Sequence, residues 1–441
     1  MTTDLATQAE VTNARVFAIA LPAMLTNVTT PLLGVVATAV IGRLGQAHLL
    51  GGVAMASVAF DCIFWLFGFL RMGTVAFTAQ ALGAGDKTEQ RAVLARALFI
   101  AGATGIALIV LQVPLAAAIF GPMGGSEAVT AAAKQYFFVR LWSAPFALAN
   151  YVMLGWLVGL ARAKTGMAIQ IFVNLANMAL MIALVLGLDA GITGAALASV
   201  IAEGAGLVLG LGIAWRLLGG RLALTTAILF DRARLMRMLA VNRDIMIRTA
   251  ALIAAFLFFT ARGARAGDVT LAANAVLHNF TLVGAFFLDG MATAAEQLCG
   301  QAYGARDRTG FARAVKLVLG WGFTFGVAAT LLFFAIGPWM IDAMTASEDV
   351  RAVARQFLWL AALAPICGVM AFCYDGIYIG ATWARDMRNL MVAALAIYLA
   401  AWWFTQPLGN AGLWIAILVF FVARGGLQAA RYPALVKAPF A

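Results

Sequence analysis

The ionisable side chains that lie well inside long apolar stretches of this chain are the first candidates for chemistry: Asp61, Arg71, Glu203, His278, Asp289, Glu296 and Asp375. Charged groups at such positions are costly in a bilayer, so they mark functional sites by default. With about 100° of rotation per residue, His278, Asp289 and Glu296 fall within roughly 20° of one another on one helix, and Asn274 lies about 40° away. One polar stripe is therefore predicted along that helix.

Carboxyl groups on such a stripe could exchange protons. In a cleft of low dielectric constant the charged form of a carboxyl group is disfavoured, so the group can bind and release protons near neutral pH. We predict that Asp289 and Asp375 are ion-coupling acids, with Glu296, His278 and Asn274 along the same path. Alternatives stay open here: either aspartate could cap a broken helix or pair with a cation, Glu296 lies nearer the cytoplasmic end, and a single histidine is often a hydrogen-bonded core residue.

Other polar and soft side chains suggest supporting roles. Asp61 and Arg71 are about 80° apart around one helix, so each needs a partner elsewhere. Glu203 is the predicted partner of Arg71, and buried charges paired in this way are usually structural. Amide, aromatic and methionine side chains could line a substrate cleft, although most such residues face lipid or neighbouring helices. The candidates for substrate contact are Asn27, Asn174, Asn177, Asn274, Met291 and Tyr374.

The elements that position these residues are membrane spans. Hydrophobic residues make up 64% of the 441 residues and charged residues 11%, against about 25% charged in a soluble domain. An apolar stretch of about 20 residues crosses the hydrocarbon core. Twelve such stretches predict an all-α membrane protein, at about 15–42, 49–82, 92–120, 129–161, 165–188, 191–218, 240–263, 270–303, 312–342, 351–381, 388–406 and 411–436.

The distribution of basic residues predicts the orientation. The net charge is +11, but most of the 30 lysines and arginines follow even-numbered stretches. By the positive-inside rule, both termini and the even-numbered connections face the cytoplasm. Membrane topology thus explains the charge, and no nucleic-acid partner is expected. The odd-numbered connections hold only Arg43, Lys134, Arg262, Arg265, Arg351 and Arg355.

The chain is internally doubled. Gln80–Asp86 (QALGAGD) reappears 221 positions later as Gln301–Asp307 (QAYGARD), and the same offset joins Gly155 to Gly376. An even number of spans in each half requires parallel repeats related by an axis along the membrane normal, which is a layout of secondary transporters. We predict two six-helix bundles, residues 1–218 and 240–441, joined by a cytoplasmic linker at 219–239 that is partly amphipathic.

Several stretches together carry a family resemblance. They are LPAMLTNVTTPLLG (21–34), TAVIGRLG (38–45), TAQALGAGD (78–86), NRDIMIRT (242–249), DGMATAAEQLCGQAYGARD (289–307) and DGIYIGATWARDMRN (375–389). The chain resembles the multidrug and toxic compound extrusion (MATE) family, in particular its DinF-like branch. This resemblance implies a V-shaped pair of six-helix bundles in a bacterial inner membrane, exporting organic, often cationic and amphipathic compounds in exchange for H+ or Na+. Related plant proteins export organic acids such as citrate, so an anionic substrate is also open.

One departure from the family bears on the mechanism. Members that couple through the amino-terminal half carry an aspartate in the first span, in a pattern like VDTAVIG, where this chain has Ala37. A second acid, expected in the fifth span four residues after an asparagine, is replaced by Met181, which follows Asn177. Either coupling has moved, or this copy is impaired, or Ala37 is an introduced substitution.

Other protein classes fit less well. The chain has two histidines and no HExxH pattern, so neither a catalytic nucleophile with its base nor a metal site is indicated, and no cofactor is expected beyond the coupling ion. The stretch nearest to a phosphate-binding loop, Gly159–Thr165, lacks the glycine before the lysine. A lipid flippase of related fold is the nearest rival. Such flippases usually line their cleft with several cations, whereas here only Arg71 is clearly within a predicted span and the place of Arg140 is open. We expect a monomer whose partners are small organic substrates and membrane lipids.

Overall fold

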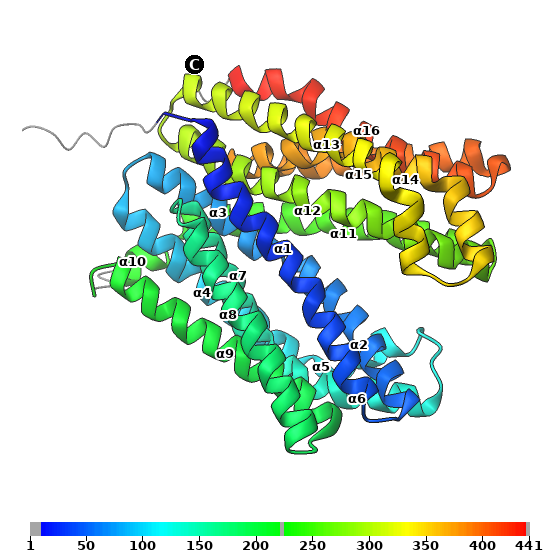
Figure 1. Ribbon diagram of the computed structural model, residues 1–441. Coiled ribbons are helices and arrows are strands. Elements are labelled where there is room, and N and C mark those ends of the chain that lie inside the picture. Colours follow the sequence, from blue (N-terminus) through cyan, green and yellow to red (C-terminus); the bar gives the residue numbers. More distant parts are fainter. Residues whose placement is uncertain (1–9, 221–224, 438–441) are drawn as a thin grey trace, which may run out of the picture. The chain divides into compact units, whose positions relative to one another are not determined.

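The structure is a computed structural model that describes residues 10–220 and 225–437, except for the side chains of residues 28, 30 and 31. Nearly all of the described chain is helical (Figure 1). The helices are α1 (Asn13–Gly42), α2 (Ala47–Leu66), α3 (Phe69–Gly83), α4 (Lys87–Val110), α5 (Gln112–Phe120), α6 (Glu127–Arg140), η1 (Leu141–Ser143), α7 (Ala144–Gly159), α8 (Ala163–Ile182), η2 (Ala183–Gly187), α9 (Gly191–Leu217), α10 (Thr226–Leu229), α11 (Arg232–Arg265), α12 (Asp268–Gly304), α13 (Arg308–Met344), α14 (Glu348–Gly380), α15 (Ala384–Thr405), η3 (Gln406–Leu408) and α16 (Asn410–Lys437).

Twelve segments of the described chain are long and apolar enough to cross a membrane, which confirms the predicted all-α membrane fold. Several of these spans contain a break or a change of helix type, among them the second, the fourth and the fifth. The second breaks between α2 and α3 at Phe67 and Gly68, and the fifth ends in the π-helical turn η2. The fourth contains the 3-10 turn η1 just before Pro145, whose ring removes a backbone donor and disfavours an unbroken helix.

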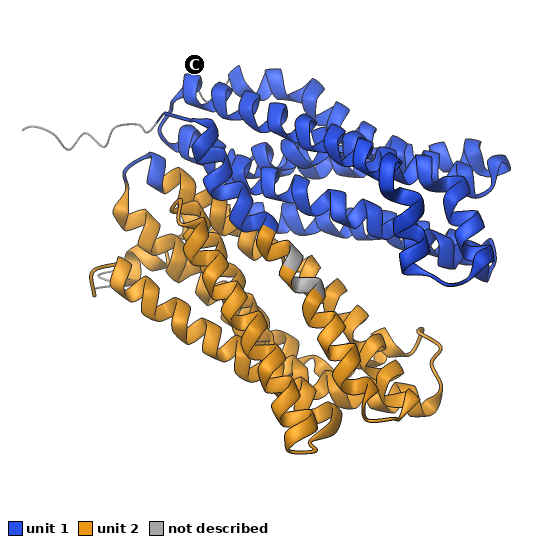
Figure 2. Cartoon of the chain, viewed as in Figure 1, with its two compact units in different colours: residues 1–24, 82–85, 240–441 blue, residues 25–81, 86–239 orange. Residues whose placement is uncertain are grey.

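The described chain separates into two compact units (Figure 2). Unit 1 contains residues 240–441, the chain up to Met24 and residues 82–85, and unit 2 contains residues 25–81 and 86–239. This division differs from the predicted lobes in three respects. The first part of α1 and residues 82–85 group with the carboxy-terminal half. The described part of the predicted linker groups with unit 2. Residues 221–224 of that linker lie outside the described residues.

The linker is held on unit 2 by Arg96 of α4, which is 2% exposed. Its guanidinium donates to the carbonyl oxygens of Ile228 (2.6 Å) and Leu229 (3.1 Å) at the end of α10. The same guanidinium pairs with Glu89 at 2.8 Å, and Glu89 also pairs with Arg234 at the start of α11. A cation near the last carbonyls of a helix satisfies acceptors that lack intrahelical partners. Arg96 therefore anchors the linker rather than lying in a cytoplasmic loop.

The repeated sequence motif forms the same turn in both halves. Asp86 caps α4 by accepting from the Glu89 amide at 2.8 Å, and Asp307 caps α13 by accepting from the Gly310 amide at 2.9 Å. The residue before each aspartate is left-handed, with φ of 69° at Gly85 and 54° at Arg306. A second pair with this offset, Ala161 and Thr382, has φ of 58° and 57°. The 221-residue repeat is therefore a repeat of backbone conformation.

Equivalent glycines also allow equivalent helices to touch. A Cβ atom added at Gly155 of α7 would lie 2.5 Å from the carbonyl oxygen of Arg71 in α3. A Cβ atom added at Gly376 of α14 would lie 2.2 Å from the carbonyl oxygen of Ala292 in α12. Arg71 and Ala292 are themselves 221 residues apart, so the two contacts are copies of each other. Small residues that let backbones approach closely are typical of helix packing in membranes.

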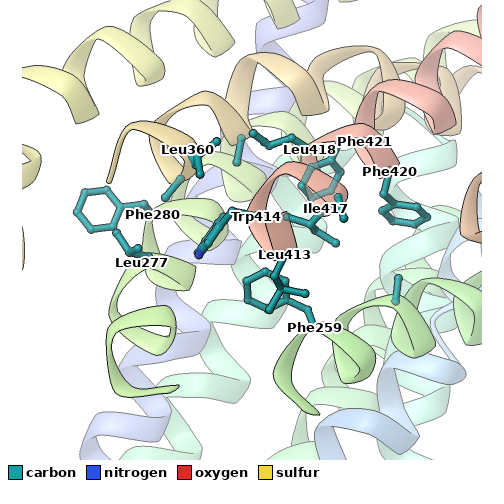
Figure 3. Close-up of a cluster of buried hydrophobic side chains, with 14 of the residues drawn as sticks. Phe259, Leu277, Phe280, Leu360, Leu413, Trp414, Ile417, Leu418, Phe420 and Phe421 are labelled. Carbon is teal, nitrogen blue, oxygen red and sulfur yellow. The ribbon is translucent and has the colours of Figure 1, made fainter. Parts of the chain in front are cut away.

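Six helices, α11 to α16, contribute to the core of unit 1, and four of them meet around Trp414 of α16 (Figure 3). Phe259 of α11 meets this indole edge to face, with ring centroids 5.0 Å apart. Leu277 and Phe280 come from α12, and Leu360 comes from α14. These four spans carry all the site residues predicted in the second half, so this apolar core fixes the helices on which those residues lie.

Candidate ion-coupling site

The predicted polar stripe lies on one continuous helix, α12, which contains His278, Asp289 and Glu296. Glu296 is 2% exposed, whereas His278 and Asp289 are partly exposed. At 1.5 Å per residue the two carboxyl groups are about 10 Å apart along the helix axis. A proton moving between them would need an intermediate carrier, such as water or another side chain.

His278 borders a small cavity within unit 1. The cavity has a volume of about 40 Å³ and is mostly apolar. The imidazole lies edge to face against Phe256, with ring centroids 5.8 Å apart, and the nearby Thr281 hydroxyl is buried without a hydrogen-bond partner. A cavity of this size has room for a water molecule beside polar side chains. Its lining is Phe256, His278, Thr281, Leu282, Ala285, Leu288, Ala364, Pro365, Phe372 and Phe421.

Asn274, on the same helix α12, forms hydrogen bonds with residues of α16. Its amide nitrogen donates to Asn410 Oδ1 at 2.8 Å, and the Asn410 amide donates back to Asn274 Oδ1 at 3.0 Å. Trp414 Nε1 donates to the same oxygen at 2.9 Å. Asn274 is 3% exposed, so these bonds link α12 to the start of α16 inside the unit. Its proposed place on an ion path would require this contact to open.

Asp375 is the centre of a buried charged cluster in unit 1. Arg248 of α11 and Arg424 of α16 both form ion pairs with its Oδ2 atom, and Gln428 Nε2 donates to Oδ1 at 2.7 Å. All four residues are at most 4% exposed. Tyr378 donates its hydroxyl hydrogen to the Gln428 carbonyl oxygen at 2.7 Å. The cluster carries two positive charges and one negative charge and ties α11, α14 and α16 together.

The two arginines of this cluster were missed as site residues. Both lay inside predicted spans, Arg248 in 240–263 and Arg424 in 411–436, yet they were counted with the cytoplasmic connections. The structure also places Arg140 inside the fourth span. The expectation that Arg71 is the sole cation clearly within a span is therefore wrong. An arginine within a span can be identified by its distance from the span's end, which is eight residues for Arg248 in the predicted span 240–263.

The amides predicted in unit 2 are bonded to other spans. Asn174 donates to the Thr29 hydroxyl of α1 at 3.1 Å and accepts from Gln170 at 3.2 Å. Asn177 donates to the Ser199 hydroxyl of α9 at 3.2 Å. Met181, which replaces an expected acid, is 2% exposed. The remaining predicted amide, Asn27, is partly exposed on α1.

The charged residues predicted to be structural in unit 2 lie among further polar side chains, and the pairing of Arg71 with Glu203 stays a prediction. Glu203 of α9 accepts from Asn150 Nδ2 of α7 at 2.6 Å. Arg140 lies within electrostatic range of both Glu203 and Asp61. Arg71, Asp61, Arg140 and Glu203 all act electrostatically on Tyr151. The structure therefore brings Asp61, Arg71 and Glu203 into one region and adds Arg140 and Asn150, which the sequence analysis did not select.

Two predicted substrate contacts are buried inside unit 1. Met291 is 0% exposed and Tyr374 is 8% exposed. Tyr374 packs against Tyr378 and Tyr432, with ring centroids 6.5 and 5.8 Å apart. In this conformation both side chains form part of the unit's own packing. Within the described ranges, no group of three histidine, cysteine, aspartate or glutamate side chains could hold a metal ion.

Twelve apolar spans in two units with equivalent turns, and buried ionisable groups in both units, define a multi-pass membrane transporter. The family model described as MatE matches residues 22–183 and 245–404. The chain therefore belongs to the MATE family of efflux transporters and is not an enzyme.

Individual relatives agree with this membership. The chain is 38% identical to DNA damage-inducible protein F of Escherichia coli over 413 residues, covering 92% of this chain and 89% of that one. It is 28% identical to the probable multidrug resistance protein NorM of Caulobacter vibrioides, covering 92% and 88%. A crystal structure of a MATE protein in the bent conformation matches with a TM-score of 0.87 at 19% identity, covering 96% and 95%, which shows the shared fold.

Proposed function

We propose that this transporter exports organic, amphipathic or cationic compounds in exchange for H+ or Na+ by alternating access. The observation that carries the proposal is the placement of titratable groups. Asp289 is a partly exposed carboxyl on a transmembrane helix of unit 1, in line with His278 and Glu296. The positions at which amino-terminal coupling would need acids are Ala37 and Met181. The relative described as a probable multidrug resistance protein supports the export of drug-like compounds.

Within the proposed ion-coupling set of Asp289, Asp375, Glu296 and His278, we assign different tasks to the two aspartates. Protonation of Asp375 would remove its ion pairs with Arg248 and Arg424 and leave two buried cations without a counter-charge, which is strongly unfavourable. Asp289 has a partly exposed side chain through which an ion can enter and leave. Asp289 therefore carries the ion, and Asp375 holds three spans in the arrangement that coupling requires.

The test is the pH gradient in everted membrane vesicles, followed with a pH-sensitive dye during addition of a cationic drug, with and without Na+. Drug should dissipate the gradient in wild-type vesicles, and Asp289→Asn should lower the rate at least tenfold, which corresponds to about 1.4 kcal/mol. Asp268→Asn is the matched control, because Asp268 is an exposed acid in the first turn of the same helix. Equal rates for wild type and Asp289→Asn would contradict the assignment.

A second candidate substrate class is organic anions or lipid-linked anions. It is favoured by the arginines within spans, Arg140, Arg248 and Arg424, and by the excess positive charge around Asp375. The same vesicles distinguish the classes, because an anion exporter would take up labelled citrate and leave the cationic drug unmoved. Uptake of the drug without citrate would remove small organic anions such as citrate from this alternative.

The remaining proposals concern placement. We place the protein in the bacterial inner membrane with both termini in the cytoplasm, as a monomer surrounded by lipid, because basic residues concentrate in the even-numbered connections. Labelling of single cysteines introduced at Arg43 and Arg308 by a membrane-impermeant reagent tests this orientation. Reaction at position 308 from the outside of intact cells would refute it.

A further inference from the structure

Unit 2 contains a carboxyl group whose closest partner is neutral. Asn150 Nδ2 of α7 donates to Glu203 Oε2 at 2.6 Å and to the Glu203 backbone oxygen at 2.9 Å. Among the described residues, no lysine or arginine forms an ion pair with Glu203 within 4.0 Å. The other atom of the same carboxamide, Asn150 Oδ1, is buried without a hydrogen-bond partner, and Asn150 is 7% exposed.

Arg140 is the cation that acts electrostatically on Glu203, and its guanidinium packs against aromatic rings. Arg140 of α6 lies 4.6 Å from the ring centroid of Phe60 and 5.7 Å from that of Tyr136, and it donates to the Tyr136 hydroxyl at 3.3 Å. Its Nε atom is buried without an acceptor. Aromatic faces hold a guanidinium without neutralising it. Arg140 therefore offers a positive field to Glu203 while leaving its carboxylate outside an ion pair.

The other ionisable groups around this carboxyl come from the helices α2, α3 and α7. Asp61 on α2 shares the field of Arg140, and Tyr151 on α7 lies within electrostatic range of Glu203, Asp61 and Arg71 of α3. Glu203 is thus the acid among them that is both partly buried and hydrogen-bonded across a helix interface, whereas Asp61 is exposed. This setting suits a carboxyl group that changes its protonation state.

We propose that Glu203 is a proton-binding carboxyl of unit 2 that takes part in the antiport cycle, with Asn150 as its hydrogen-bond partner in both states and Arg140 as its counter-charge. This proposal rests on the proposed function. In the ionised state Glu203 accepts from Asn150 Nδ2. After one proton binds, the carboxyl becomes a neutral O–H donor, and Asn150 Oδ1, which has no partner now, can accept it after rotation of the carboxamide. Asp61 then remains as the ionised carboxyl that Arg140 can balance.

Infrared difference spectroscopy tests the proton binding itself and needs no transported compound. Purified protein in lipid is taken from alkaline to mildly acidic pH, and the C=O stretching band of protonated carboxyl groups is recorded. We expect a band that is absent from Glu203→Gln and present in Glu127→Gln, a variant of an exposed acid in the first turn of α6. Asn150→Ala should shift the frequency of the same band because it removes the hydrogen-bond partner. A difference spectrum that is identical in wild type and Glu203→Gln would overturn the proposal.

Drug-driven proton exchange in proteoliposomes then tests the role in transport. Glu203→Gln should reduce the exchange about tenfold, within the usual range of coupling between sites. Binding of the cationic drug to detergent-solubilised Glu203→Gln protein should be retained and should lose its pH dependence. If wild type itself moves no protons on drug addition, the proposed function fails while the infrared result still decides whether Glu203 binds a proton. A folded Glu203→Gln variant with wild-type exchange would exclude Glu203 from the cycle.

Discussion

The same helix interface carries opposite chemistry in the two halves of the molecule. Glu203 on α9 and Arg424 on α16 are 221 residues apart, so they occupy equivalent places in the repeat. Arg424 pairs with Asp375 of α14, whereas the residue equivalent to Asp375 in α7 is Leu154, and Glu203 instead bonds to Asn150 one turn earlier. The repeat thus retains the backbone packing of these spans and changes the charges placed on them.

The difference separates a fixed charge from a variable one. In unit 1 two arginines and a glutamine saturate one carboxylate, so a change in its charge would disrupt three spans. In unit 2 a single amide holds the carboxyl, and the nearby cation lies on aromatic rings. Loss of charge should therefore be costly at Asp375 and tolerable at Glu203. Substitution of Asp375 should therefore change mainly stability, whereas substitution of Glu203 should change mainly transport.

The largest expected effect is on Asp375. Asp375→Asn leaves Arg248 and Arg424 buried without a counter-charge, and breaking a buried pair in this way costs about 3–5 kcal/mol. Glu203→Gln keeps a hydrogen-bonding side chain of the same shape and should cost less than about 1 kcal/mol. Unfolding of the purified proteins in detergent measures both changes.

Asp386→Asn is the control for that experiment, since it removes an ion pair with Arg431 whose arginine side chain is 51% exposed. Surface pairs contribute about 0–1 kcal/mol, so this variant should resemble wild type. Equal destabilisation by Asp375→Asn and Glu203→Gln would remove the distinction between a fixed and a variable carboxyl.

A smaller effect is expected where the halves are alike. Gly376→Ala would place a methyl group 2.2 Å from the carbonyl oxygen of Ala292, and Gly155→Ala would place one 2.5 Å from that of Arg71. Forcing packed helices apart costs about 1–3 kcal/mol, and both variants should lose stability by similar amounts. Gly426→Ala is the matched control in a helix, because a Cβ atom there meets nothing within 4 Å. A tolerated Gly376→Ala with a damaging Gly155→Ala would show that the two contacts are not equivalent.

Features encoded in local composition were predictable from the sequence. Twelve apolar stretches indicate twelve spans. The motif that begins at Gln80 and again at Gln301 corresponds to two turns, each with a left-handed residue followed by an aspartate cap. The alignment of His278 with Asp289 followed from helical periodicity alone, because α12 is unbroken between them.

Partners that depend on packing between distant helices were not predictable in this way. Asp375 meets Arg248 and Arg424 at separations of 127 and 49 residues, and no spacing rule connects α11, α14 and α16. The reciprocal amide pair of Asn274 and Asn410 joins residues 136 positions apart. Arg248 and Arg424 lie within predicted spans, but the positive-inside rule assigns charges to connections and ignores depth in the membrane.

The smallest expected effect concerns the turns that the repeat shares. Thr382 and Ala161 have φ of 57° and 58°, a conformation that costs about 1–2 kcal/mol for residues other than glycine. Thr382→Gly should therefore raise the free energy of unfolding by about 1 kcal/mol, since relief of strain exceeds the entropy lost by glycine, and Ala161→Gly should gain less because alanine has no branched Cβ. Thermal unfolding of each variant in the same detergent measures the gain. Ala381→Gly is the control, because Ala381 has φ of −80° and gains nothing from glycine. A loss of stability in Thr382→Gly would mean that contacts of the threonine side chain outweigh its backbone strain, and the two turns would then share a conformation but not its cause.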